Sequence, residues 1–288
     1  MWKLNKPSLQ KAKDDIDLAF PKKKNKKGVK SCQLSVKQKK DLAALYDKYN
    51  NQKGRMTVEE VKKVCSSKAN DIKKKYNNIQ KGKGLFFIRK ELFNGIAYCP
   101  YCGISEPAQL DHFLPESEYP VLAINRQNLV PLCPHCNNIK RAKDYRKFIH
   151  AYYDDFPNDV FFIIQTTIIE NHLHLEYGLD KSVFVGYEDT LSKIESQLNE
   201  LELSVEWNRA VNVFLFSFFP ESIYNGTEDG LRIYLQNRYE EYVGSHGLND
   251  WRTALLRSLK ENPNFTTDVI KNMIKTFSIT NRANEILV

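Results

Sequence analysis

Four cysteines occur as two Cys-x-x-Cys pairs, CPYC at Cys99 and Cys102 and CPHC at Cys133 and Cys136, with 30 residues between the pairs. Structural zinc takes four ligands in a tetrahedron, and two tight turns that each offer two thiolates satisfy it. The spacing therefore predicts a closed zinc site that holds the fold and takes no part in a reaction. His135 lies inside the second pair. A site of three cysteines and His135 is therefore the alternative.

Polar residues of differing chemistry lie between and beside these pairs: Asp111, His112, Asn128 and Asn137. The imidazole of His112, with an ordinary pKa of about 6.5, can accept a proton at neutral pH. Neighbouring strand residues point to opposite faces, so Asp111 and His112 can share a site only at a strand end or where the backbone is irregular. The residues alone predict a zinc-supported site with an Asp and a His. Taken singly, each has a plainer interpretation as a turn residue, a cap or a buried histidine.

The charge of the chain is unevenly distributed. Residues 1–90 hold 26 Lys and Arg against 8 Asp and Glu, residues 91–150 hold 6 of each kind, and residues 151–288 hold 11 against 21. The basic first third predicts contact with a polyanion, most simply nucleic acid. A solvated, lysine-rich helical surface is the alternative. The acidic last third is a candidate surface for the basic segment of the same chain or for a basic partner.

The apolar stretches bear on the compartment. The N-terminal residues lack the apolar run of a secretory signal, and the longest apolar stretches, at 160–164 and 211–219, are too short to cross a bilayer. We therefore expect a cytoplasmic protein with no membrane partner. Cysteines stay reduced in that compartment, which favours metal ligands over disulfides. Cys32 and Cys65 fit no pair and are interpreted as ordinary thiols.

Periodic patterns surround the cysteine pairs and predict the elements that position them. The basic run at 21–30 is predicted to be a loop or a mobile arm. Helices are predicted at 35–50, 85–93, 137–148, 227–243 and 249–260, and a further helix is predicted to begin at a capping box from Thr57 to Glu60. A β-hairpin that turns at Glu170 and Asn171 is predicted before the last two of these helices. The chain thus divides into a basic helical region (1–91), a cysteine-bounded segment (92–148) and an acidic region (149–288).

The order CPYCG, LDHFLP and NLVPLCPHCNNIK within residues 97–148 resembles the HNH nuclease family, which has the ββα-metal fold. The resemblance implies that Asp111 binds a catalytic divalent metal and that His112 is the general base. It also implies that Asn128 orients this histidine through its backbone or its side chain. Asn137 stands at the last motif position, where the family has His or Asn, and is implied as the second metal ligand. The implied fold class is α+β and mostly helical, with a zinc-stabilised ββα core between two helical regions.

The family's activity implies a metal-dependent endonuclease with DNA as the expected substrate. A carboxylate and an amide suit a hard cation such as Mg²⁺ or Mn²⁺. Lys140, Arg141 and Lys143, on the predicted helix after the second cysteine pair, are candidates for phosphate contacts. RNA cleavage is an open alternative. So is a zinc-dependent module that binds nucleic acid without cutting it, although binding alone needs neither an Asp–His pair nor Asn137.

A narrower resemblance rests on flanking sequence. The stretches MWKLNKP, DHFLPESEYP and FIHAYYDDFP are similar to the HNH subunits of bacterial ATPase-plus-nuclease defence systems, of the Septu and retron-associated types. This resemblance implies a role in anti-phage defence with an ABC/SMC-like ATPase partner, for which the acidic last third is a candidate docking surface. A stand-alone nuclease is the alternative.

Overall fold

The computed structural model describes residues 3–21, 33–141 and 143–285, with side chains as far as residue 276. Residues 22–30 of the predicted basic arm, and Cys32, lie outside the described residues. The chain divides into an N-terminal unit, formed by residues 2–156 and 192–201, and a C-terminal unit, formed by residues 157–191 and 202–288. The regions predicted at 1–91 and 92–148 therefore share one unit.

The N-terminal unit begins with a helical layer. Ser35 caps α2 through a capping box with Gln38, and Thr57 caps α3 through the predicted capping box with Glu60. The face of α2 that carries Leu42, Leu45 and Tyr46 is buried, as the periodicity predicts. The elements of this layer are α1 (Leu9–Ala19), α2 (Val36–Asn51), α3 (Val58–Lys62), η1 (Ser66–Lys68), α4 (Ala69–Lys74), η2 (Lys75–Ile79) and α5 (Phe86–Phe93).

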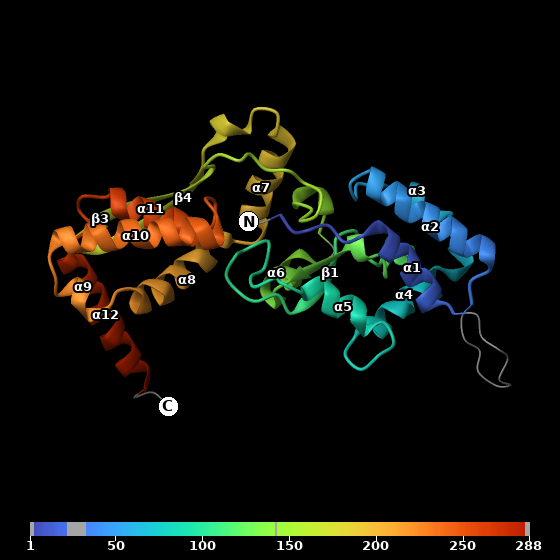
Figure 1. The fold of residues 1–288 in the computed structure, drawn as a ribbon, viewed down its shortest axis with the longest axis horizontal. Helices are drawn as coiled ribbons and strands as arrows, with labels where there is room; N and C mark the ends of the chain where they lie inside the picture. The colour runs from blue at the N-terminus through green and yellow to red at the C-terminus, as the bar shows by residue number, and fades with distance from the viewer. Residues whose placement is uncertain (1–2, 22–32, 142, 286–288) are drawn as a thin grey trace. The chain divides into compact units, whose positions relative to one another are not determined.

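A small ββα motif follows in the same unit. Strands β1 (Gln109–His112) and β2 (Leu129–Leu132) pair antiparallel, with Asp111 opposite Val130 and His112 opposite Leu129. Helix α6 (Pro134–Lys140) packs against β1, and α5 packs against β2 (Figure 1). The helical layers around this small sheet confirm the predicted α+β, mostly helical fold class.

The prediction of a helix at 137–148 is wrong at both ends. Helix α6 starts earlier, because Cys133 caps it and Pro134, whose fixed φ suits a first turn, occupies its first position. It ends at Lys140, and Arg141 adopts a φ of 40°, which breaks the helical backbone. A 3₁₀ turn, η5 (Tyr145–Lys147), follows.

The C-terminal unit combines the predicted hairpin with helices. Glu170 and Asn171 adopt φ values of 51° and 62°, as a two-residue hairpin turn requires, and they join β3 (Phe162–Ile169) to β4 (His172–Leu179). The predicted helices at 227–243 and 249–260 are confirmed as α10 (Glu228–His246) and α11 (Trp251–Glu261). The remaining helices are α7 (Glu188–Glu200), whose residues from 192 on belong to the N-terminal unit, α8 (Leu203–Phe218), α9 (Glu221–Tyr224) and α12 (Thr267–Glu285).

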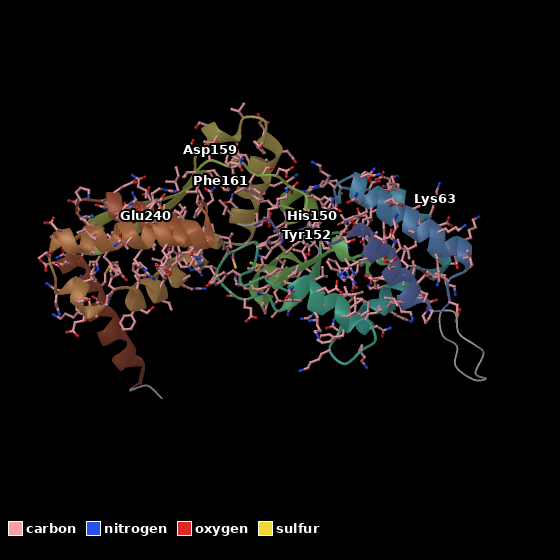
Figure 2. The ribbon with its side chains drawn as sticks, in the orientation of Figure 1. Lys63, His150, Tyr152, Asp159, Phe161 and Glu240 are labelled. Atoms are coloured by element: carbon pink, nitrogen blue, oxygen red, sulfur yellow. The ribbon has the colours of Figure 1, made fainter. Side chains whose placement is uncertain are left out.

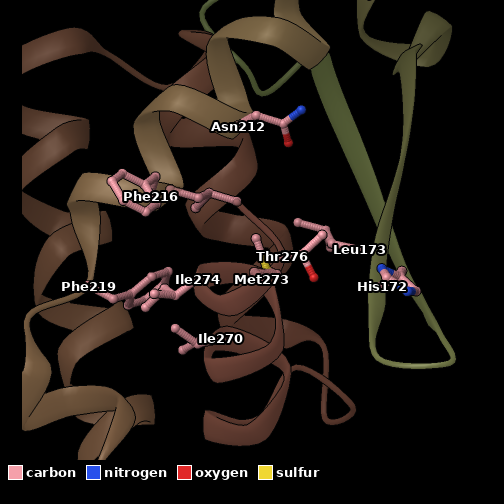
Figure 3. Close-up of a pocket in the computed structure, with 10 residues that line it drawn as sticks. His172, Leu173, Asn212, Phe216, Phe219, Ile270, Met273, Ile274 and Thr276 are labelled. Atoms are coloured by element: carbon pink, nitrogen blue, oxygen red, sulfur yellow. The ribbon is translucent and has the colours of Figure 1, made fainter. Parts of the chain in front are cut away.

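An apolar pocket of about 390 Å³ lies within the C-terminal unit (Figure 3). Leu173 of β4, Phe216 of α8 and Met273 of α12 contribute to its lining. None of the candidate site residues lines it. Across the part of the chain that the structure describes, no helix has both the length and the apolar character that crossing a membrane requires.

Candidate active site

The four cysteines of the two pairs converge in the N-terminal unit. Their sulfur atoms all lie within 4.8 Å of one another and their side chains are buried. A tetrahedral zinc site with Zn–S bonds of about 2.3 Å places its sulfurs about 3.8 Å apart, and the Cys102 and Cys133 sulfurs are 3.8 Å apart. The donor set and its geometry therefore fit zinc. His135 is exposed and does not belong to the cluster, which argues against the three-cysteine alternative.

Backbone groups prepare these sulfurs for a metal ion. The Ile104 amide donates to the Cys102 sulfur at 3.4 Å, and the Cys136 amide donates to the Cys133 sulfur at 3.4 Å. Burial raises the pKa of the Cys99 thiol well above its ordinary value. Four buried thiols resist ionising together, and a bound zinc ion would offset that cost. The cluster thus ties the segment before β1 to the start of α6.

Asp111 is buried and faces α6. Its Oδ2 atom lies 2.7 Å from the ammonium of Lys140, although the geometry is that of an ion pair and not of a directed hydrogen bond. Burial raises the pKa of Asp111 to about 6, against the lowering effect of Lys140. A buried carboxylate oxygen without a directed hydrogen bond is a fitting ligand for a hard divalent cation. The site therefore satisfies one requirement of the predicted catalytic metal.

Asn137 meets a partner that the sequence did not suggest. Its amide nitrogen donates to Oε1 of Gln109 at 2.6 Å. Gln109 and Asp111 are two residues apart on β1, so their side chains share the face of the strand that α6 covers. The contact leaves the amide oxygen of Asn137 available as a ligand. The two-residue spacing from Asp111 was the signal in the sequence that could have identified Gln109.

His112 is the last residue of β1, which is the strand-end position that would let neighbouring Asp and His residues serve one site. Its Nε2 atom lies 3.0 Å from the Ala123 carbonyl oxygen. A carbonyl only accepts, so Nε2 carries the proton and Nδ1 is the basic nitrogen. Burial lowers the pKa of His112 below its ordinary value. The Tyr76 ring packs against the imidazole with 4.5 Å between ring centroids. His112 is thus a neutral imidazole with a fixed tautomer.

Asn128 acts on the loop after His112 and not on the imidazole itself. Its oxygen accepts from the Leu114 amide at 2.8 Å, and its nitrogen donates to the Leu114 carbonyl at 3.1 Å. The predicted contact that orients His112 is made by Ala123. Asn128 therefore fixes the backbone two residues beyond His112.

A buried network from outside the ββα motif holds Asn128. The Tyr49 hydroxyl donates to Oδ1 of Asn128 at 3.0 Å and lies 3.0 Å from Nε2 of His150. The His150 ring packs on Phe113 with 4.0 Å between centroids, and Figure 2 shows it next to Tyr152 in the N-terminal unit. Gly54 passes so close that an added Cβ would lie 2.5 Å from the His150 ring. The loop after His112 is thus braced by α2 and by the chain around His150.

The three residues predicted to contact phosphate differ in their surroundings. Lys140 is fully buried, pairs with Asp111 and donates to the His112 carbonyl at 3.1 Å, so in this structure it is not available to a ligand. Lys143 pairs with Glu200 at 2.7 Å. Arg141 is exposed. The prediction failed for Lys140 because it assumed a solvent-exposed polar helix, whereas the last turn of α6 faces β1.

Residues 99–143 match the family model of the HNH endonucleases. These residues form an HNH endonuclease domain. The match contains both cysteine pairs, the β1–β2 pair and α6.

Two relatives share a segment of similar size. Protein ea31 of Escherichia phage lambda is 37% identical over 70 residues, which are 22% of this chain and 23% of that protein. The Septu protein PtuB of Bacillus thuringiensis is 39% identical over 57 residues, which are 19% of this chain and 22% of that protein. The chain thus covers less than a quarter of the length of each of these relatives. No solved structure matches the chain.

Proposed function

We propose that this chain is a metal-dependent HNH endonuclease that hydrolyses phosphodiester bonds in DNA. The observation that carries the proposal is the match of residues 99–143 to the HNH endonuclease model, and the sequence resemblance implies that Asp111, His112 and Asn137 stand at the motif positions of that family. The basic character of residues 1–90 supports a polyanionic substrate.

His112 is the proposed general base. Its Nε2–H donates to the Ala123 carbonyl, which leaves Nδ1 free to take a proton from the attacking water. The lowered pKa keeps the imidazole neutral, and therefore able to accept a proton, at neutral pH. The Ala123 contact also resists rotation of the ring while the proton moves.

Asp111 and Asn137 would hold the divalent cation, with Gln109 turning the Asn137 amide so that its oxygen is presented. An all-oxygen donor set of this kind suits Mg²⁺ or Mn²⁺. When bound, such an ion supplies charge stabilisation to the phosphate and to the leaving oxygen. Lys140 balances the charge of Asp111 in the metal-free site.

A cleavage assay tests this proposal directly. Plasmid DNA and a structured RNA are incubated with the zinc-loaded chain and Mg²⁺ or Mn²⁺, and His112→Ala is the matched variant. General base catalysis contributes on the order of 10²–10⁴-fold to a rate, so we expect metal-dependent DNA nicking that falls by that factor in the variant. Equal cleavage by both chains would remove His112 from its role. Preferential cleavage of RNA would reassign the substrate.

We further propose that the nuclease is the effector of an anti-phage defence system and acts with an ATPase partner. The similarity to the Septu protein PtuB supports this proposal. A segment of protein ea31 of Escherichia phage lambda is similar as well, so a separate test decides between a defence effector and a stand-alone nuclease. If the chain is inactive alone and nicks DNA once lysate of its host is added, a partner controls it. Full activity of the purified chain would favour a stand-alone nuclease.

A further inference from the structure

One stretch of the N-terminal unit lies beside His112 and lies outside the HNH domain. Residues 73–83, KKKYNNIQKGK, hold five lysines and no acidic residue. They form the end of α4, the 3₁₀ turn η2 and the loop that leads to α5. We call this stretch the lysine segment.

Three contacts fix the lysine segment against the candidate active site. Tyr76 packs its ring on the His112 imidazole, and its hydroxyl donates to the Leu110 carbonyl of β1 at 2.8 Å. Lys73 pairs with Glu116, in the loop after His112, at 3.5 Å. The segment therefore forms a wall on the side of β1 that His112 faces.

The lysines of this wall differ from most others in the unit. Lys11, Lys13, Lys39 and Lys48 each pair with a carboxylate at 2.5–2.9 Å. Lys74, Lys81 and Lys83 are exposed, and in the described part of the chain none of them has an acidic partner. Their charges are therefore not compensated within the residues that the structure describes.

The loop that carries the last two of these lysines leaves room for a ligand. Gly82 has a φ of 78°, and a Cβ added at Gly82 or Gly84 would meet no atom within 4 Å. Such a backbone is open to close approach by a bulky polyanion.

We propose that the lysine segment is the surface that holds the nucleic-acid backbone across the active site, with Lys74, Lys81 and Lys83 contacting successive phosphates. This inference rests on the proposed nuclease function and specifies where its substrate binds. It assigns the polyanion contact to one wall beside the proposed base, and not to the basic N-terminal region as a whole. Contacts of this kind give affinity without reading sequence.

The test compares two triple variants of the full-length chain that remove the same charge. Lys74→Gln, Lys81→Gln and Lys83→Gln are combined in one. The control replaces three exposed lysines of α2 and of the end of α3 by Lys37→Gln, Lys62→Gln and Lys63→Gln (Lys63 is labelled in Figure 2). Both sets are placed in the His112→Ala chain so that the substrate stays intact. Binding of a fluorescein-labelled DNA duplex is followed by anisotropy over a range of salt concentrations.

Each lost phosphate contact lowers the slope of log affinity against log salt by about 1. We expect the lysine-segment variant to lose a slope of about 2–3, and the control to lose less than half as much. An unchanged slope, or the same loss in both variants, overturns the inference. If the wild-type chain nicks plasmid but the lysine-segment variant keeps its full salt slope, the proposed binding surface is wrong. The proposed nuclease function then still stands. A His112→Ala chain that binds no DNA overturns this surface, and a wild-type chain that cleaves neither alone nor with host lysate overturns the proposed nuclease.

Discussion

Replacing Lys140 with Met should destabilise the N-terminal unit, and by an amount that depends on pH. The Lys140 side chain is fully buried, and its ammonium lies 2.7 Å from Asp111 Oδ2 and 3.1 Å from the His112 carbonyl oxygen. Methionine fills a similar volume but leaves the buried carboxylate without a counterion. Removing one partner of a buried ion pair costs about 3–5 kcal/mol. For a unit of this size, that cost lowers the melting temperature by roughly 6–20 °C.

The pH dependence follows from the carboxyl group. The folded-state pKa of Asp111, about 6, lies above its ordinary value of 3.8, so ionisation of Asp111 opposes folding. The penalty is absent below the lower value, grows as pH rises between the two and is complete above the higher one. Without Lys140 the folded-state pKa rises further. We therefore expect the loss in Lys140→Met to be largest near pH 8 and small near pH 5, where the carboxyl group is protonated in the folded state.

The assay needs a signal for each unit, because a two-unit chain does not unfold in one transition. Zinc release to a coloured chelator reports the N-terminal unit, which holds the cysteine cluster. Fluorescence of Trp207 and Trp251, both buried in the C-terminal unit, reports the other in a Trp2→Phe background. Lys143→Met is the matched control, because the half-exposed pair with Glu200 contributes only about 0–1 kcal/mol.

If Lys140→Met releases zinc at the wild-type midpoint at pH 8, the buried ion pair does not stabilise the unit. If the loss is the same at pH 5 and pH 8, the ionised carboxylate is not its cause. A shift in tryptophan fluorescence equal to the shift in zinc release would mean that the effect is not confined to the unit that contains the pair.

Three further predictions concern residues around the site. Cys99→Ser should lose zinc and unfold the N-terminal unit together, measured by metal analysis and circular dichroism; a folded, zinc-free variant would contradict a structural role. Gly54 has a φ of 76° and lies against the His150 ring, so Gly54→Ala should destabilise the unit by about 1–3 kcal/mol in the zinc-release assay. A zinc-release midpoint equal to that of the wild type would argue against this close approach. Tyr76→Phe keeps the ring on His112, whereas Tyr76→Ala removes it. The kcat for nicking should therefore fall at least about tenfold more in Tyr76→Ala than in Tyr76→Phe. Equal rates in the two variants would mean that Tyr76 does not position the base.

Those parts of the fold that depend on neighbouring residues were predictable from the sequence. The capping boxes at Ser35 and Thr57 and the turn at Glu170 and Asn171 involve residues no more than a few positions apart, and the cysteine spacing specifies a tetrahedral donor set. Helix α12 and the end of α6 at Lys140 were not predicted. The inward turn of Lys140 depends on Asp111, which is far away in the chain, and no local pattern records that contact.

The candidate site divides in the same way. The residue types at Asp111, His112 and Asn137 could be identified from motif positions, and their metal and base roles remain proposals. The partners of these residues could not be identified, because a backbone carbonyl such as that of Ala123 has no signature in a sequence. Gln109 is the exception, since strand alternation relates it to Asp111.

The brace around Asn128 limits how the HNH domain can be exchanged between proteins. The loop after His112 is supported by the Tyr49 hydroxyl and the His150 ring, and neither residue lies within 99–143. A graft of that segment into another scaffold would carry the ligands and the base but leave the loop after the base unsupported. A transplantable cassette would need to extend from α2 through His150, with Gly54 and His150 inherited as a pair because each leaves the other so little room.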